Sequence, residues 1–558
     1  MAYIKIDNVS FQYPDSSHHA LNQVSFTIEE GEFIVIAGPS GCGKTTLLKL
    51  LKKELTPVGE LSGKITYKGM PLESVAEKTS SQEIGFVFQN PENQIVMEDV
   101  LSELVFGMEN LGVNSEEMRQ RVAEMVHFFG LASLLQADTH TLSGGQKQLI
   151  NLASVLLLKP KLLLLDEPTS QLDPVQSKEF LQFLKRLNEE FGITILLVEH
   201  RLEELYSIAD RVVLLTEGSL QYIGTAKSVI HQVWTEKDER FLPYLPSVSK
   251  LFYYVQSSGF ALNEVPITVK EAHKWLHQLQ EIEGSEPDTP PANPDRKISL
   301  QCKQIHYKYN KDDAYVLKNL SLNVYEGDYL AIVGGNGSGK STLLKCCTAI
   351  IKPIKGTVLL KGKKIRTYKK ADLEREIGYL PQNPLLCFMA ETLEEELMNL
   401  AARFPISNPK ERIASLTKQL GIDHILLKHI HDCSGGEQQK AALATILFSS
   451  PNVLLIDEPT KGMDPVSKQQ FAEMLKELHE KGMTIIMVTH DIEFAASHVN
   501  RCLMLFDGMI TVDGRTEQVL KGNYFYTTAI NRVTRDTHVP EILTLEEACA
   551  AWRLPVQS

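Results

Sequence analysis

The chain has 558 residues, 43% of them hydrophobic and 23% charged, which is enough for several cores at the usual ~100–200 residues per domain. Its 57 basic and 70 acidic side chains give a net charge of −13, which argues against a general nucleic-acid-binding protein. Eight cysteines without a C-x-x-C pair exclude a disulfide scaffold and indicate a reducing compartment. The N-terminus MAYIKIDNVSFQYP lacks the apolar core of a signal peptide. No stretch approaches the ~20 apolar residues of a membrane span, so we expect any membrane role to need a partner.

The first motif is a glycine loop between a predicted strand and a predicted helix. Gly38-x-x-x-x-Gly43-Lys44-Thr45 follows the apolar run Phe33–Ala37 and precedes the helical pattern TLLKLLKK. Glycines allow backbone N–H groups to surround phosphates, and the helix N-terminus adds its positive end. Lys44 supplies a cation and Thr45 offers a hydroxyl to Mg²⁺. The segment therefore predicts a nucleotide phosphate site.

Two later apolar runs end in groups suited to hydrolysis. Leu162–Leu165 leads to Asp166 and Glu167, and Ile193–Val198 precedes His200. A carboxylate at a strand end can hold Mg²⁺ through water, and the next one can polarise an attacking water as a general base. Continuous apolar runs suit parallel strands that helices cover on both faces, so we predict an α/β fold with a parallel sheet.

The same series returns in the second half of the chain. GGNGSGKS at Gly334–Ser341, VLLIDEPT at Val453–Thr460 and VTH ending at His490 repeat the loop, the acidic strand end and the histidine. The spacing between matching motifs drifts by only a few residues. This is the pattern of a tandem duplication of a whole domain.

A third motif identifies the family that both halves resemble. LSGGQ at Leu142–Gln146 and CSGGE at Cys433–Glu437 precede the DEPT strands, and with the other motifs they resemble ABC-type ATPase domains. The resemblance covers nearly the whole chain, twice. It implies a parallel-sheet core with a helical subdomain in each half, with ATP and Mg²⁺ as cofactors. It also implies two sites formed head-to-tail, in which each signature helix presses its N-terminus on the γ-phosphate of the other half's ATP.

The resemblance also assigns the site residues. The residues expected to act in hydrolysis are Glu167, Glu458, His200, His490, Gln89 and Gln382. Those expected to hold Mg²⁺ are Thr45, Gln89, Asp166, Ser341, Gln382 and Asp457. Those expected to bind ATP are Tyr13, Gly38, Ser40, Gly41, Gly43, Lys44, Thr45, Thr46, Ser143, Gly144, Gly145, Tyr309, Gly334, Asn336, Gly337, Gly339, Lys340, Ser341, Thr342, Ser434, Gly435 and Gly436. Tyr13 and Tyr309 match the aromatic that stacks on adenine.

A few positions depart from the family pattern or belong to its interface. Asp173 and Asp464 match the loop that crosses between the two domains. Cys433 and Glu437 replace the usual Leu and Gln of the second signature, and Cys42 lies inside the first phosphate loop. No catalytic residue is missing from either half, so two competent sites are expected.

The repeat and the composition predict five segments. The first ATPase domain spans 1–235 and the second spans 298–521. Small C-terminal extensions follow at 236–278 and 522–558, because PITVKEA at 266–272 has an echo in ILTLEEA at 542–548, each resembling a capped helix start. The acidic, proline-rich stretch 279–297 is predicted to be a linker.

The segment after Gln89 resembles a particular group of these ATPases. NPENQIVMEDVLSELVFGMENLG, together with HRLEEL after His200, is similar to energy-coupling factor ATPases, including cobalt-type importers; the second half diverges more. This implies a peripheral protein on the cytoplasmic face of the cell membrane. Its partners would be a membrane coupling subunit and a substrate-binding membrane protein, importing a vitamin or related micronutrient.

Two other readings remain open. A soluble tandem ATPase acting on ribosomes would carry a long charged arm, whereas the linker here is short and acidic. The fused ATPase of a sugar importer resembles this chain less after the glutamine. KGKKIRTYKK at Lys361–Lys370 is the only dense basic run and is expected to be a solvated hairpin, so no nucleic-acid partner is predicted.

Overall fold

The computed structural model describes residues 2–14, 16–170, 172–257, 264–277, 296–404 and 408–554. The chain divides into two units, Met1–Pro246 and Ser247–Ser558. Apart from its last two residues, the predicted linker 279–297 lies outside the described residues.

The main sheet of unit 1 contains the strands expected from the apolar runs. Its order is β10-β9-β3-β8-β7-β6, and every neighbouring pair is parallel except β9 with β10. All residues of β3, β7 and β8 are buried, as strands covered on both faces require. The bounds are β3 Phe33–Ala37, β6 Ile84–Val87, β7 Leu162–Asp166, β8 Thr194–Val198, β9 Arg211–Thr216 and β10 Ser219–Gly224.

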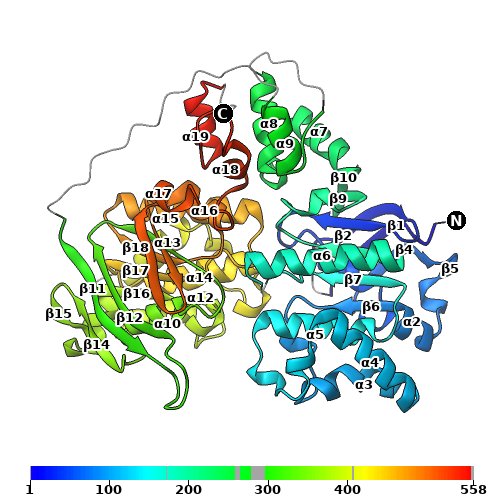
Figure 1. The fold of residues 1–558 in the computed structure, drawn as a ribbon, viewed down its shortest axis with the longest axis horizontal. Coiled ribbons are helices and arrows are strands. Elements are labelled where there is room, and N and C mark those ends of the chain that lie inside the picture. The colour runs from blue at the N-terminus through cyan, green and yellow to red at the C-terminus, as the bar shows by residue number, and fades with distance from the viewer. Residues whose placement is uncertain are drawn as a thin grey trace. The chain divides into compact units, whose positions relative to one another are not determined.

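A second, antiparallel sheet and a set of helices complete unit 1. The sheet has the order β2-β1-β4-β5, with β1 Ile4–Gln12, β2 Leu21–Ile28, β4 Glu60–Tyr67 and β5 Met70–Pro71. The helices are α1 Lys44–Leu50, α2 Glu77–Glu83, α3 Val100–Asn110, α4 Ser115–Phe129, α5 Gly144–Leu156, α6 Pro174–Phe191 and α7 Ala226–Glu236. Helices α3, α4 and α5 pack together and form the helical subdomain (Figure 1).

Unit 2 repeats this architecture. Its main sheet has the order β20-β19-β13-β18-β17-β16, which matches unit 1 strand for strand. The bounds are β13 Tyr329–Val333, β16 Ile377–Leu380, β17 Val453–Asp457, β18 Thr484–Val488, β19 Arg501–Phe506 and β20 Met509–Arg515. The smaller sheet has the order β12-β11-β14-β15, with β11 Ile298–Tyr307, β12 Leu317–Tyr325, β14 Lys355–Leu360 and β15 Lys363–Lys364. The predicted α/β class with two parallel-sheet domains is confirmed.

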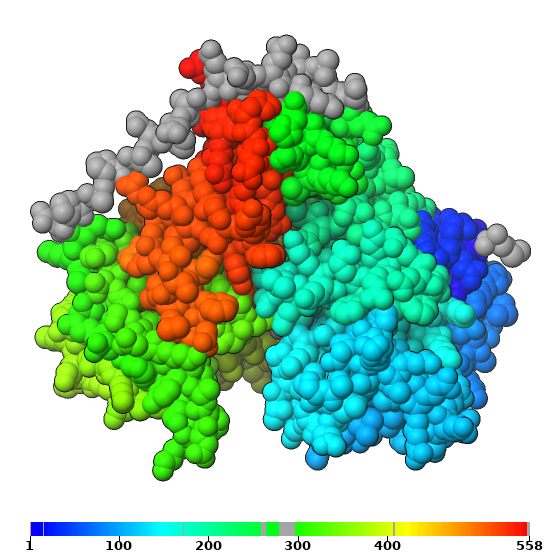
Figure 2. All heavy atoms as spheres, viewed as in Figure 1, coloured from blue at the N-terminus to red at the C-terminus, as the bar shows by residue number. Residues whose placement is uncertain are grey.

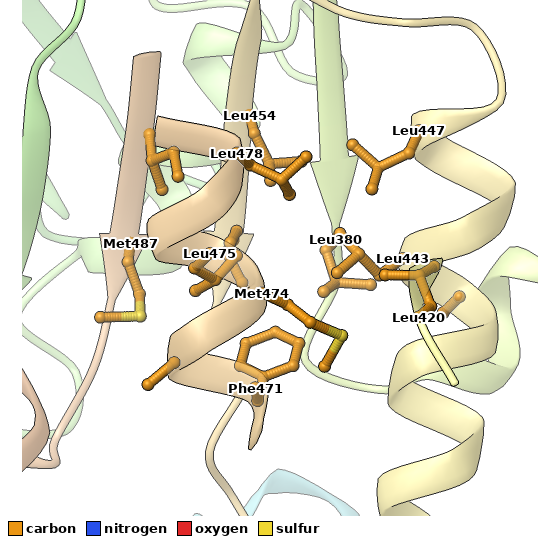
Figure 3. Close-up of a cluster of buried hydrophobic side chains, with 14 of the residues drawn as sticks. Leu380, Leu420, Leu443, Leu447, Leu454, Phe471, Met474, Leu475, Leu478 and Met487 are labelled. Carbon is orange, nitrogen blue, oxygen red and sulfur yellow. The ribbon is translucent and has the colours of Figure 1, made fainter. Parts of the chain in front are cut away.

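The helices of unit 2 cover its sheet and close its core. They are α10 Lys340–Cys347, α11 Lys370–Glu376, α12 Leu393–Arg403, α13 Pro409–Gln419, α14 Gly435–Leu447, α15 Pro465–Glu480, α16 Ile492–His498 and α17 Thr516–Leu520. Figure 3 shows one buried cluster to which α15 contributes Phe471 and Leu475, α14 contributes Leu443 and β16 contributes Leu380. These contacts fix the helix that carries the second signature against the sheet that carries the acidic strand end.

Four short helices of unit 2 come from both predicted extensions. Helices α8 Ser247–Ser257 and α9 Val269–Leu276 precede the linker, whereas α18 Ala529–Thr534 and α19 Leu545–Ala551 end the described chain. Helix α9 packs on α18, and α8 packs on both α18 and α19. The space-filling view shows α18 and α19, in red, directly against α8 and α9, in green (Figure 2). The two extensions therefore form one helical cluster within unit 2.

Matching polar contacts organise the two parts of this cluster. Thr268 and Thr544 accept hydrogen bonds from the backbone N–H groups of Glu271 and Glu547, each at 3.1 Å. These glutamates in turn accept from Ile267 N and Leu543 N, the residues before the two N-caps, so each echo in the sequence is a capped helix start with the same pair of contacts.

Within the ranges described above, no helix combines the length and the hydrophobicity that crossing a membrane requires.

Candidate functional site

The first phosphate loop joins β3 to α1 in a conformation that needs glycine. Gly43 is the N-cap of α1 with φ 97°, and a Cβ there would lie 2.2 Å from the carbonyl oxygen of Ala20. The Lys44 side chain is buried, and its Nζ donates to the carbonyl oxygens of Gly38 and Pro39, both at 2.8 Å. The loop thus encloses the cation that sequence analysis assigned to the phosphates. In unit 2, Lys340 Nζ donates to the Gly334 oxygen at 3.0 Å.

The residues assigned to Mg²⁺ come together at the carboxyl end of each sheet. Thr45 Oγ1 donates to Asp166 Oδ1 at 3.0 Å, and Ser341 Oγ donates to Asp457 Oδ1 at 3.0 Å. Burial, followed by the charge of Glu167, raises the pKa of Asp166 to about 6. Burial also raises the pKa of Asp457. These sites offer hard oxygen ligands and costly buried charge, which fits a divalent cation that would neutralise the carboxylates and the phosphates beside them.

The proposed general bases sit between the two other predicted catalytic groups. Glu167 Oε2 accepts from Gln89 Nε2 at 2.6 Å, and its Oε1 lies 2.8 Å from His200 Nε2. In unit 2, Glu458 Oε2 accepts from Gln382 at 2.8 Å. Both glutamates have positive φ, 44° for Glu167 and 49° for Glu458, a strained conformation typical of functional sites. Each site thus brings together its glutamine, glutamate and histidine from three separate segments.

The charge state of Glu458 suits a base. Burial raises its pKa, but the neighbouring His490, whose Nε2 lies 3.0 Å from Oε1, outweighs burial, and the pKa falls to about 2. An ionised carboxylate at this position can orient a water molecule and accept its proton. The amide of Gln382 contacts the other carboxylate oxygen, so two neighbours hold the Glu458 side chain in one orientation.

The two predicted adenine-binding tyrosines stand beside the helix that follows each phosphate loop. The Tyr13 hydroxyl is 3.0 Å from Thr46 Oγ1, and the Tyr309 hydroxyl is 3.0 Å from Thr342 Oγ1. Tyr13 packs edge-on against Phe11, and both tyrosine rings are exposed. The contact joins each tyrosine to the first turn of α1 or α10, and adenine stacking stays a prediction.

The signature residues form the N-termini of α5 and α14. Ser143 caps α5 in a capping box with Gln146, and Ser434 caps α14 in a capping box with Glu437. The first two residues of each helix are the predicted glycines, Gly144 and Gly145 in α5 and Gly435 and Gly436 in α14. A glycine pair leaves backbone N–H groups open to an anion. The pairing of each signature with the other half's phosphate loop stays a prediction.

The predicted interface aspartates act as helix caps. Asp173 accepts from the backbone N–H groups of Val175 and Gln176, and Asp464 accepts from those of Val466 and Ser467. Each cap fixes the start of the long helix, α6 or α15, that follows the acidic strand end.

Sequence reasoning missed three buried glutamates near the sites. Glu103 of α3 accepts from the backbone N–H groups of Val96 and Met97, and Glu396 of α12 accepts from those of Met389 and Ala390. Glu199 lies directly before His200 and is 3% exposed. Comparing the halves would have found the first two, because each follows a helix N-cap, Asp99 or Thr392, by four residues. No local pattern marked Glu199 as buried.

Comparisons with known proteins match both halves of the chain to one family. A family model described as ABC transporter matches residues 21–170 and 317–461, more than half of the chain, and a model described as an AAA domain matches 427–496. A protein of Bacillus thuringiensis subsp. konkukian (strain 97-27), named "Putative ABC transporter ATP-binding protein", is 44% identical over 553 residues, 98% of each chain. A relative of the same name from Methanosarcina mazei is 33% identical over 93% of this chain and 90% of its own.

The solved structures that are similar to part of the chain include cbiO1 from Clostridium perfringens, described as part of the ABC transporter complex cbiONQ. It is 30% identical, covers 40% of this chain and 90% of its own, and has a TM-score of 0.37. The family match in both halves and the full-length relatives show that the chain belongs to the ATP-binding, ATP-hydrolysing proteins of the ABC transporter family.

Proposed function

We propose that this ATPase energises an energy-coupling factor importer for a vitamin or related micronutrient. The observation that carries the proposal is the segment after each catalytic glutamine, which presents apolar side chains to solvent. After Gln89, Val96 is 67% exposed; after Gln382, Leu386 is 74% and Met389 is 98% exposed. Exposed apolar side chains beside a catalytic residue suit a docking partner.

Hydrogen bonds to buried glutamates fix the backbone of the segment after each glutamine. The buried carboxylates of Glu103 and Glu396 each accept two hydrogen bonds from it, at 2.7–2.9 Å. A rigid backbone with outward apolar side chains is a suitable receptor for the apolar face of a partner helix. Because Gln89 and Gln382 bond the proposed bases, movement of a docked helix would reach the site of hydrolysis directly.

The alternatives find less support. A ribosome-associated ATPase would be expected to present basic surface, whereas this chain carries a net charge of −13 and an acidic linker. A sugar-importer ATPase stays the second candidate, because its coupling subunits would also use the segment after the glutamine.

The docking proposal predicts a selective loss of partner binding. Met389→Asp and Val96→Asp should reduce recovery of a small membrane coupling protein when the tagged chain is purified from detergent-solubilised membranes of its own cells. Val58→Asp is the matched control, because Val58 is 82% exposed and lies away from the glutamine segments in the chain. ATP binding should be unchanged in all three variants. Co-purification of ribosomes, or equal loss with the control, would refute the proposal.

We further infer that the two halves close head-to-tail, so that Lys44 and Ser434 serve one site, and Lys340 and Ser143 the other. Lys44→Ala with Ser434→Arg should then be little worse than either single change, because both disable one site. Lys44→Ala with Ser143→Arg should be far worse, because both sites are lost. ATPase rates of the single and double variants measure this. The opposite ranking would mean that each loop works with its own signature.

A further inference from the structure

Glu199 is a buried acid with three hydrogen bonds at the edge of the first ATP site. Its Oε1 accepts from the backbone N–H of Thr169 at 2.9 Å and from the Thr169 hydroxyl at 2.6 Å. Its Oε2 accepts from the backbone N–H of His200 at 3.2 Å. All three hydrogen bonds are donated to Glu199, so its carboxyl group acts here as the acceptor that joins Thr169 to His200.

The partners of Glu199 flank the proposed base. Thr169 follows Glu167 by two residues, and His200 Nε2 lies 2.8 Å from Glu167 Oε1. The backbone of Glu167 itself is in a strained, positive-φ conformation, with its N–H donating to the oxygen of Val198 at 2.9 Å. One carboxylate therefore holds both the turn that carries Glu167 and the start of the segment that carries His200.

The second half places a different residue at this position. Thr489 precedes His490 and is also buried, at 1% exposed. Its hydroxyl accepts from Asp491 N at 2.9 Å, so it bonds forward along its own segment. A threonine carries no charge and is too short to replace the carboxylate of Glu199. Of the three first-half acids Asp166, Glu167 and Glu199, the first two are matched in the second half by Asp457 and Glu458, whereas Glu199 is matched by Thr489.

Retaining Glu199 has an energetic cost. Burial raises the pKa of Glu199, and the charge of Glu167 raises it further. The hydrogen bonds from Thr169 lower the pKa but do not offset these two effects. Removing a carboxylate from water beside a like charge is unfavourable unless its hydrogen bonds are complete. A neutral residue such as Thr489 fills the corresponding place in the other half without that cost.

We propose that Glu199 is a positioning residue of the first ATP site, and that it makes hydrolysis there differ from hydrolysis in the second half. Its contacts run to the catalytic glutamate and histidine segments, whereas the phosphates are expected on Gly38–Thr45. Its loss should therefore lower the rate of hydrolysis with little change in ATP affinity. The proposal depends on ATP hydrolysis alone and not on which importer the chain serves.

The test compares Glu199→Gln in two full-length backgrounds. Glutamine has the same shape, but its NH₂ group must face one of the donors. In Glu458→Gln, where hydrolysis depends on the first site, the substitution should lower kcat about 10-fold, since misplacing reacting groups by ~1 Å costs up to ~10²-fold. KM for ATP should stay within about twofold. In Glu167→Gln, where the second site acts, kcat should be unchanged. Single-turnover rates with the protein in excess give the same comparison if one lesion stops steady-state turnover.

Two further variants keep the test decisive. Thr169→Val removes one of the three donors, whereas Thr169→Ser retains it and should restore the rate. Adding Thr169→Val to Glu199→Gln should cost little more, because both act through one contact. If Glu199→Gln does not fold, the Thr169 pair decides alone. Equal losses in both backgrounds, or a lower melting temperature with unchanged kcat, would overturn the proposal.

Discussion

One of the two residues that distinguish the two signatures is Glu437, which stands where the first half has Gln146. Its carboxylate accepts from Ser434 N at 2.7 Å and lies 2.9 Å from His424 Nε2. Burial raises the pKa of Glu437, but the hydrogen bonds from the Ser434 backbone and from His424 outweigh it and lower the pKa below the ordinary 4.5. Ser133 stands at the position in the first half that matches His424. The second signature helix therefore has an acidic residue in its capping box, in contact with a histidine that the first half lacks.

This cap predicts a pH-dependent stability difference. Because the folded-state pKa of Glu437 is depressed, its ionised form stabilises the fold above pH 4.5, and the contribution is lost as the pH falls through the folded value. Glu437→Gln should lower the free energy of unfolding at pH 7 by about 0.5–1 kcal/mol, as expected for an acid at a helix N-terminus. Urea melts from pH 7 to 3 measure it. The difference should vanish at the acid end. Gln146→Glu should raise the free energy of unfolding by less, because the first half has Ser133 in place of His424.

At the residue scale, motifs that are far apart in the sequence lead to side chains that lie close together in the structure. Thr45 contacts Asp166, and Gln89 and His200 both contact Glu167, whereas the roles of these residues toward ATP and Mg²⁺ stay predictions. Sequence analysis did not predict Glu199 as a site residue. Its contacts depend on its burial and on Thr169, which lies beside it in the fold, and the sequence pattern shows neither.

At the scale of elements, the parallel strands of the main sheets could be predicted from continuous apolar runs in the sequence, because a strand that helices cover on both faces has no polar side. The smaller sheets were not predicted. In β1, a bulge between Ile6 and Val9, with Asn8 at φ 51°, interrupts the pairing with β2 and breaks the alternation that would mark a half-buried strand. The loops after the glutamines likewise owe their shape to Glu103 and Glu396, which lie on the following helices.

At the scale of the whole molecule, the helical cluster in unit 2 should hold the two halves together without the linker. A protease site inserted near residue 287, once cut, should leave fragments that co-elute in size-exclusion chromatography, because α8 and α9 pack on α18 and α19. Leu276→Asp, at a fully buried position of α9, should allow the cut fragments to separate, since an unpaired buried charge is costly. Separation of the cut wild-type chain would contradict the prediction.

The cluster also has the symmetry of a dimer. Helices α9 and α19 are the matching capped helices. Helix α9 packs on α18 of the second extension, and α19 packs on α8 of the first; α8 and α18 also contact each other. Such an isologous contact could equally join two identical copies. Covalent fusion instead presents each extension with its unlike partner at an effective concentration on the order of millimolar. Every molecule therefore contains one half of each kind. Because two identical halves do not pair, a difference such as Glu199 in one half and Thr489 in the other is present in every molecule.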